Sequence, residues 1–373
     1  MARHVKLGRR LEGIGVVICA GPGGVGKTTT AAALALGLAR EGRRVAVVTI
    51  DPARRLASSL GMGELDNEPR RVDEALLAKQ GVRLRAGGEL WAMMLDAKGT
   101  FDALISRLAP DAAARERVLG NRIYQEASSV VAGTQEFTAV AKLYELHREG
   151  RFDVIVLDTP PSRNALDFLD APSRMVGFLE GRALRMFLAP GGLAARVVGR
   201  GTGLVLSMFS RFTGVDLLSD LSEFFGALAG MVDGFRERAH GVERLLHDPE
   251  TAFLLVSTPE PEQVRETLYF AEQLAAAELR RAAVIVNRVH EEGLHGHSEA
   301  EVREILAAEL GEPLAGRVAA NLADFDVLAS RDAASVARLR EALSEPDPII
   351  VPQLDHEVCD LASLERVAEL LLA

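Results

Sequence analysis

A glycine-rich loop that ends in lysine and two threonines is the part of this sequence best suited to chemistry. It reads Gly21-Pro22-Gly23-Gly24-Val25-Gly26-Lys27-Thr28-Thr29, with the spacing G-x-x-x-x-G-K-T. The apolar run 14–19 precedes it, and the helix-like stretch 30–40 follows it. In this context, strand then glycine turn then helix, backbone N–H groups and a helix N-terminus bind phosphate. We therefore predict a loop that binds the phosphates of a nucleotide, called the phosphate loop below.

Each polar part of the phosphate loop has an expected role. The residues expected to bind the nucleotide are Gly23, Gly24, Val25, Gly26, Lys27, Thr28 and Thr29. The ammonium of Lys27 would bridge β- and γ-phosphate oxygens, and the hydroxyl of Thr28 would ligate Mg²⁺.

Two acids that follow strand-like runs can complete a nucleotide-hydrolysing site. Asp158 ends the apolar run 154–157, where a carboxylate would hold Mg²⁺ through a water molecule. Asp51 ends the run 45–50 and can reach toward the γ-phosphate, where hydrolysis needs a group that positions water. Either acid alone could be a helix cap or a loop residue. Together with the loop, they predict catalytic roles for Lys27, Asp51 and Asp158.

The elements that would position these residues alternate between strands and helices. Expected strands cover residues 15–20, 44–50, 90–95, 154–158, 252–258, 282–289 and 349–351, and expected helices cover 28–40, 135–149, 261–278, 299–310 and 361–372. This alternation predicts an α/β fold with a mostly parallel sheet flanked by helices, and with the phosphate loop it predicts a P-loop NTPase.

One stretch, residues 171–240, has a different composition, with half of the 14 Phe and half of the 8 Met of the chain. Apolar residues from 217 to 235 follow helical spacing, and three glycines (Gly226, Gly230 and Gly234) lie on another face. We expect an inserted α-helical subdomain here, with parts of 100–150. The apolar stripe either packs inside that subdomain or forms a groove for an apolar client helix.

The remaining chain is expected to form the core of one nucleotide-hydrolysing domain over 1–373, from residues 12–100, 150–170 and 250–373. Its net charge of −10 argues against nucleic-acid binding, which calls for a basic face. No apolar run reaches 18 residues and the N-terminus has no signal-peptide stretch, so we expect a cytoplasmic protein with no stable membrane anchor.

Several segments together resemble the ArsA-type ATPases, which include the arsenite-pump ATPase and the guided-entry ATPase for tail-anchored membrane proteins. The segments are the phosphate loop, Asp51-Pro52-Ala53, Asp158-Thr159-Pro160-Pro161 with Leu166-x-Phe168-Leu169, Val286-Asn287-Arg288 and Val351-Pro352-Gln353-Leu354. The resemblance implies hydrolysis of ATP with Mg²⁺. It also implies that Asp51 orients the attacking water, that Asn287 bonds the adenine and that the loop after Pro352 covers the base.

The resemblance also implies a dimer, a homodimer or a heterodimer with an ArsA-like paralogue, because each chain has one loop. Two positions depart from the family pattern. Pro22 stands where the family has a lysine that reaches the partner's nucleotide, and Arg163 stands at a glycine of the second switch.

Metal sites of the family are not expected here. An arsenite site needs clustered thiolates, and the zinc site of the eukaryotic targeting ATPase needs a CxxC pair after Asn287. The chain has only two scattered cysteines, Cys19 and Cys359. Three histidines after Asn287 (His290, His295 and His297) could bind a metal, but we expect them to be solvated loop residues.

Three functions are compatible with these features. The first is an ATP-driven dimeric switch that handles a hydrophobic client, such as a tail-anchored membrane protein. The second is a nucleotide-binding structural subunit with weak hydrolysis, paired with a paralogue and motivated by Pro22 and Arg163. The third, a DNA-partition or division-site ATPase, is disfavoured because the C-terminal stretch 361–370 has no cationic face.

Overall fold

The computed structural model of the chain describes residues 7–50, 55–127, 134–159, 226–343 and 348–372, with the single positions 173, 174, 177 and 224. Contacts divide the chain into two compact units. The first, called the sheet unit, comprises residues 1–94, 149–165 and 247–373, and the second, called the helical unit, comprises residues 95–148 and 166–246.

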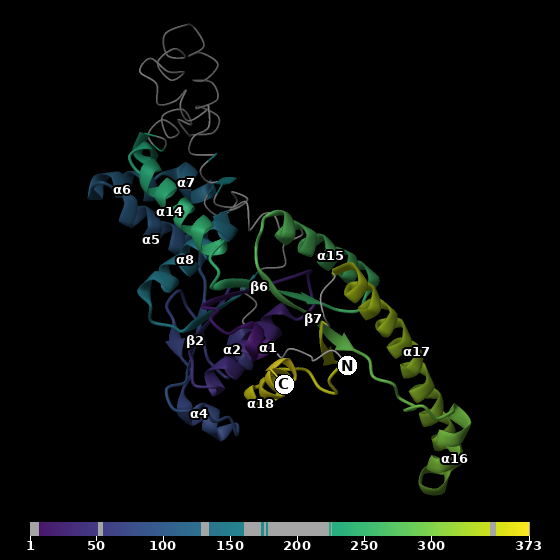
Figure 1. Cartoon of the computed structure of the whole chain (residues 1–373). Helices are drawn as coiled ribbons and strands as arrows, with labels where there is room; N and C mark the ends of the chain where they lie inside the picture. Colours follow the sequence, from purple (N-terminus) through teal and green to yellow (C-terminus); the bar gives the residue numbers. More distant parts are fainter. Residues whose placement is uncertain are drawn as a thin grey trace, which may run out of the picture. The chain divides into compact units, whose positions relative to one another are not determined.

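Eight strands form one sheet in the described part of the sheet unit (Figure 1). They are β1 (Val16–Ala20), β2 (Arg44–Thr49), β3 (Arg70–Arg71), β4 (Glu89–Met94), β5 (Val154–Asp158), β6 (Thr251–Ser257), β7 (Arg281–Val289) and β8 (Ile349–Pro352). The order across the sheet is β3-β4-β2-β5-β1-β6-β7-β8, and every neighbouring pair is parallel except β3 with β4. The predicted α/β class is confirmed.

Helices cover both faces of this sheet, which is why its central strands are continuous apolar runs. The helices of the sheet unit are α1 (Leu7–Arg10), α2 (Lys27–Arg40), α3 (Arg55–Ser59), α4 (Glu74–Lys79), α15 (Pro261–Ala276), α16 (Glu299–Leu310), α17 (Glu312–Leu343) and α18 (Leu361–Leu372). α2 and α18 contribute to one core cluster with Ile285, whereas α15 and α17 pack against Val286. Since successive strand residues point to opposite faces, the two helix pairs cover opposite sides.

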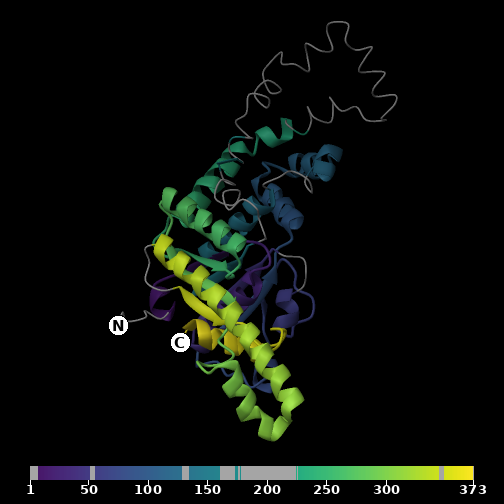
Figure 2. The same ribbon diagram turned by 90° about the vertical axis from the view of Figure 1, so that its right-hand side faces the viewer.

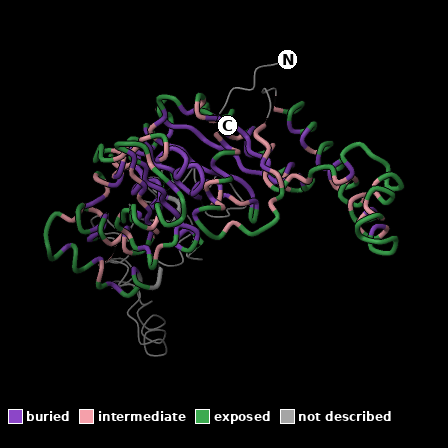
Figure 3. Tube along the Cα trace, turned by 90° about the horizontal axis from the view of Figure 1, so that it is seen from below, coloured by how far each residue is buried: buried purple, intermediate pink, exposed green. Residues whose placement is uncertain are grey.

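α16 and α17 form a helical hairpin that reaches beyond the edge of the sheet (Figure 2). The capping box of Ser298 and Glu301 begins α16, and Gly311, at a φ of 73°, joins the two helices. The hairpin is mostly exposed, unlike the buried strands (Figure 3). The apolar residues Ile305 and Val327 are 64% and 70% exposed to solvent. No helix among the described residues has the length and apolar character that crossing a membrane requires.

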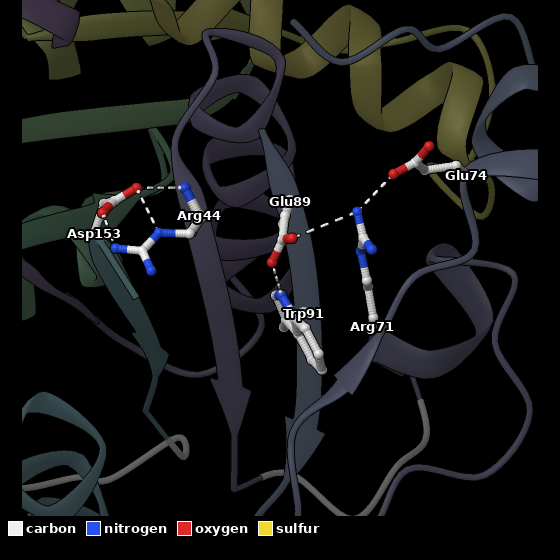
Figure 4. Close-up of polar contacts among 6 residues, drawn as sticks. All are labelled: Arg44, Arg71, Glu74, Glu89, Trp91 and Asp153. Carbon is white, nitrogen blue, oxygen red and sulfur yellow. Dashed lines mark hydrogen bonds and ion pairs between the residues drawn. The ribbon is translucent and has the colours of Figure 1, made fainter. Parts of the chain in front are cut away.

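Polar contacts gather near the residues where β2, β4 and β5 begin (Figure 4). Arg44, which begins β2, binds Asp153 before β5 with an Nη2–Oδ1 distance of 2.6 Å. Glu89 of β4 accepts from the Trp91 indole at 2.9 Å and pairs with Arg71 of β3 at 3.5 Å. The guanidinium carbon of Arg151 lies 3.9 Å from the Trp91 ring centre, within cation–π range.

The helical unit contains α5 (Ala97–Leu108), α6 (Ala112–Leu119), α7 (Arg122–Ala127), α8 (Thr134–Glu149) and α14 (Val232–Leu246). The expected helix over 217–235 lies partly outside the described residues. In its described part, residues 226–229 are helical, and a turn at Gly230 and Met231 precedes α14. The Met231 N–H donates to the Leu228 carbonyl, three residues back, at 2.9 Å. The chain therefore makes two helical segments where periodicity alone predicts one.

The described part of the apolar stripe packs inside the helical unit. Leu228, Met231 and Phe235 are buried in a cluster with Ile105 and Phe137. Gly234 allows close packing, because a Cβ there would lie 2.6 Å from a methyl group of Leu108. The rest of the stripe, toward residue 217, lies outside the described residues.

Candidate functional site

The phosphate loop connects β1 to α2, at the end of the sheet where the strands' carboxyl ends meet. Gly24 and Gly26 have φ values of 77° and 95°, a region that suits glycine, and Gly26 is the N-cap of α2. Lys27 is 6% exposed, and its Nζ donates to the carbonyls of Gly21 and Pro22 at 3.0 and 2.8 Å. The ammonium is thus held inside the curve of the loop.

Asp158 lies beside the start of α2, as the sequence predicts for a carboxylate near magnesium. β5 lies between β1 and β2, and Asp158 pairs in register with Cys19 and Thr49. Its Oδ2 accepts a hydrogen bond from the Thr28 hydroxyl at 2.7 Å. A hydroxyl oxygen and a carboxylate side by side are oxygen ligands of the kind that Mg²⁺ takes. The residues present therefore fit a magnesium nucleotide.

The same carboxylate oxygen accepts a second hydroxyl, from Thr49 at the end of β2, at 2.8 Å. Thr49 was not among the predicted site residues, because no local sequence signal marks a threonine in a strand as part of a site. The signal that could have found it is its position two residues before Asp51, at the end of a predicted strand. We expected that strand to lie next to the phosphate-loop strand, which is wrong, because β5 lies between β2 and β1.

Asn287 and Pro352 lie at the carboxyl ends of β7 and β8. The Asn287 side-chain amide donates to the Val25 carbonyl at 2.9 Å, and a Cβ on Gly26 would lie 2.4 Å from the same nitrogen. Asn287 therefore contacts the phosphate loop itself. Pro352 pairs with Val289, two residues after Asn287. The structure thus brings both residues expected near adenine to the end of the sheet that holds the loop.

Several residues of the sequence predictions lie outside the described residues. They are Asp51, Pro52 and Ala53 of the first switch, and Pro160, Arg163 and the Leu166 to Leu169 segment of the second. The described part of the predicted site therefore consists of the phosphate loop, Thr28, Asp158, Asn287 and Pro352.

Comparison with known proteins fits this geometry. The sequence model of the anion-transporting ATPase family matches residues 14–304. The chain belongs to this family. An Aquifex aeolicus protein named as an arsenical pump-driving ATPase is 27% identical over 95% of this chain and 78% of its own length. ATPase BagA of Mycobacterium tuberculosis is 25% identical over 96% and 93%, and ATPase GET3A of Arabidopsis thaliana is 25% identical over 74% and 68%.

The chain is accordingly an ATPase of the anion-transporting family, and two observations bear on the metal sites known in that family. His290 lies in the loop after β7, as expected, but it is only partly exposed and binds Asp332 of α17, with 2.8 Å between Nδ1 and Oδ2. Among the described residues, no three His, Cys, Asp or Glu side chains are grouped closely enough to hold a metal ion.

Cys19 is predicted to be unreactive in the folded ATPase. Burial raises the pKa of its thiol and the nearby Asp158 carboxylate raises it further, whereas Lys27 lowers it. A thiol held protonated is a poor nucleophile. Cys359 is exposed. Titration with a thiol reagent should therefore modify one cysteine in the native protein and both after unfolding in denaturant. Rapid modification of both in the native protein would contradict the buried position of Cys19.

Gly21 is predicted to be the glycine whose replacement damages this ATPase most. A Cβ there would lie 2.1 Å from the Val256 carbonyl oxygen of β6, so β1 and β6 would have to separate. We expect Gly21→Ala to cost about 3 kcal/mol or more in the free energy of unfolding. Gly24→Ala is the matched control, because Gly24 also has a positive φ but no atom within 4 Å of the new Cβ.

Denaturant unfolding of the nucleotide-free protein measures both variants. Gly24→Ala should lose only the cost of a left-handed alanine, about 1–2 kcal/mol. Equal losses for the two variants would show that backbone conformation, and not the contact with β6, determines the need for glycine at position 21.

Proposed function

We propose that this chain is a magnesium-dependent, ATP-hydrolysing dimeric switch that couples ATP turnover to the handling of a hydrophobic client. The observation that supports it most is the 2.7 Å hydrogen bond from the Thr28 hydroxyl to the Asp158 carboxylate, at the residue that follows the enclosed Lys27. Binding a triphosphate with Mg²⁺ requires a cation for the phosphates, here Lys27, and oxygen ligands for the metal, here from Thr28 and Asp158.

In the proposed reaction, each residue of the loop acts on the nucleotide. Backbone N–H groups of Gly23 to Thr29 would bind phosphate oxygens at the start of α2. Lys27 would leave the two loop carbonyls and bind the β- and γ-phosphate oxygens, where charge develops. Mg²⁺, when bound, would neutralise the phosphate charge, held by Thr28 and, through water, by Asp158. Asp51 would orient the water that attacks the γ-phosphorus.

The adenine is proposed to bind near the carboxyl ends of β7 and β8. Asn287 would exchange its bond with the Val25 carbonyl for the base, and the segment after Pro352 would cover it. This exchange would connect occupation of the base site with release of the contact between Asn287 and the phosphate loop.

The client is proposed to be an apolar helix, such as the membrane segment of a tail-anchored protein, handled by the helical unit. The support is the resemblance to the targeting ATPases and the Phe- and Met-rich composition of residues 171–240. The test is retention of a transmembrane-helix peptide by the purified protein in each nucleotide state. Retention in none of the states, with or without a partner chain, would remove the client from the proposal and leave the ATPase untouched.

A second candidate function is that of a structural subunit with weak hydrolysis, and it rests on Pro22. Pro22 replaces the lysine that would reach the partner's nucleotide, and here its carbonyl accepts from Lys27. ATP turnover separates the hydrolysing switch from the structural subunit. It is measured for the chain alone, for the chain with an ArsA-like paralogue, and for the Asp51→Asn variant. Substantial turnover by the lone chain that is lost in Asp51→Asn supports the hydrolysing switch. Turnover only with the paralogue, unchanged in Asp51→Asn, supports the structural subunit.

A further inference from the structure

Thr49 is a buried residue that faces the metal-binding carboxylate from a neighbouring strand. It is the last residue of β2 and lies directly opposite Asp158 of β5 in the parallel register. Residues in register on adjacent strands project from the same face of a sheet. Thr49 is 2% exposed and Asp158 1%, so little water competes for the contact between them.

The contact is a hydrogen bond to an oxygen that already accepts another. The Thr49 hydroxyl donates to Asp158 Oδ2 at 2.8 Å, and the Thr28 hydroxyl donates to the same atom at 2.7 Å. Hydrogen bonds to an ionised carboxylate are stronger than those between neutral groups. Two donors from separate elements, the end of β2 and the start of α2, therefore fix the orientation of one carboxylate.

We propose that Thr49 is a positioning residue of the magnesium site, which it serves by holding Asp158 in place for Thr28. A threonine hydroxyl has one proton and two lone pairs. When the Thr28 hydroxyl donates its hydrogen bond to Asp158, its oxygen lone pairs stay available to a cation. Thr49 holds Asp158 Oδ2 in position to accept the Thr28 hydrogen bond, in the way that groups bonded to metal ligands orient those ligands. This inference rests on the proposed magnesium-dependent function.

Burial alone does not explain the bond made by Thr49. Thr251 of β6 is also a buried threonine of the same sheet, at 1% exposure. Within the part of the chain that the structure describes, its hydroxyl has no hydrogen-bond partner. The sheet therefore accommodates a buried threonine that makes no such bond, and Thr251 provides a matched control for substitution by valine.

The test compares Thr49→Val, which keeps the shape and removes the hydroxyl, with Thr49→Ser, which keeps the hydroxyl. Calorimetry measures ADP binding to the full chain over a series of MgCl₂ concentrations and in EDTA. We expect Thr49→Val to raise the half-saturating magnesium concentration by about tenfold, the lower end of outer-shell effects. Its ADP affinity in EDTA should be unchanged, and Thr49→Ser and Thr251→Val should match the unsubstituted protein.

Two results would overturn the role of Thr49. One is an unchanged magnesium dependence in Thr49→Val. The other is an equal loss of ADP affinity with and without magnesium, which indicates a structural role only. If Thr49→Val does not fold, Thr49→Ala removes the same hydroxyl and is judged by the same criteria. If the ADP affinity of the unsubstituted protein does not depend on magnesium, the proposed function is overturned, and this inference with it.

Discussion

Replacing Lys27 with alanine is expected to reduce ATP turnover by about 10²–10³-fold or more, the loss that follows removal of a preorganised donor from a buried site. The Lys27 ammonium is 6% exposed and already lies inside the loop curve, against two carbonyls. The phosphate loop itself therefore excludes water from this ammonium. The variant should also bind ATP more weakly, because the triphosphate loses its buried counter-charge.

Steady-state ATP turnover and nucleotide calorimetry measure both effects of Lys27→Ala. Lys27→Arg should be almost as inactive, because a planar guanidinium does not fit a cradle formed around an ammonium. Lys79→Ala is the matched control, since Lys79 is an exposed lysine in the last turn of α4 and should keep full turnover. Turnover of Lys27→Ala within a few-fold of the unsubstituted protein would contradict the proposed role of the loop.

Asp158→Asn is expected to have the second largest effect, a loss of about 10²-fold in turnover together with the loss of magnesium dependence. Asparagine can still accept the Thr28 and Thr49 hydroxyls through its carbonyl oxygen, so the fold of β5 should persist. It lacks the negative charge that would hold a metal-bound water. The variant should therefore bind ADP in EDTA as well as the unsubstituted protein does, and gain little from added MgCl₂.

Asp153→Asn is the control for this substitution, because Asp153 directly precedes β5, at the opposite end of the strand from Asp158. There it binds Arg44, which lowers the pKa of Asp153 mainly through the side-chain hydrogen bond. That pair is exposed to solvent, so turnover should not change in Asp153→Asn. If both aspartate variants lose turnover equally, or if Asp158→Asn keeps its response to magnesium, the metal role of Asp158 is wrong.

Much of the sheet unit could be predicted because its signals are local. The G-x-x-x-x-G-K-T spacing and the apolar runs give β1, α2 and β5 within one residue of their observed limits. Buried parallel strands are short apolar runs, and the helices that alternate with them are longer, so segment length separates the two. Chain order then indicates that the carboxyl ends meet, and the structure places Asp158 beside Thr28.

Other elements could not be predicted, because their signals are not in their own residues. The two-residue strand β3 exists only through its pairing with β4. The 32-residue helix α17 has an exposed, polar surface and Pro313 in its first turn, so its periodicity is weak. The turn at Gly230 interrupts a spacing that reads as one helix.

Pairings between distant side chains were equally hidden. The bond of Thr49 to Asp158 depends on strand register, and that of Asn287 to Val25 joins residues 262 positions apart. The sequence indicates which strands end near the loop but not which side chains are in register with each other there. That information comes only from the pairing of β2 with β5 and from the place of β7 in the sheet.

Trp91 is the single tryptophan of the chain, and it lies in β4 with the Arg151 guanidinium against its ring. Intrinsic indole emission therefore has one source, fixed in the sheet unit and next to a cation that perturbs its excited state. A spectral change during denaturation would report separation of β4 from the residues before β5. Rearrangements confined to the helical unit would be silent at this wavelength and would need a dye or another tryptophan placed there.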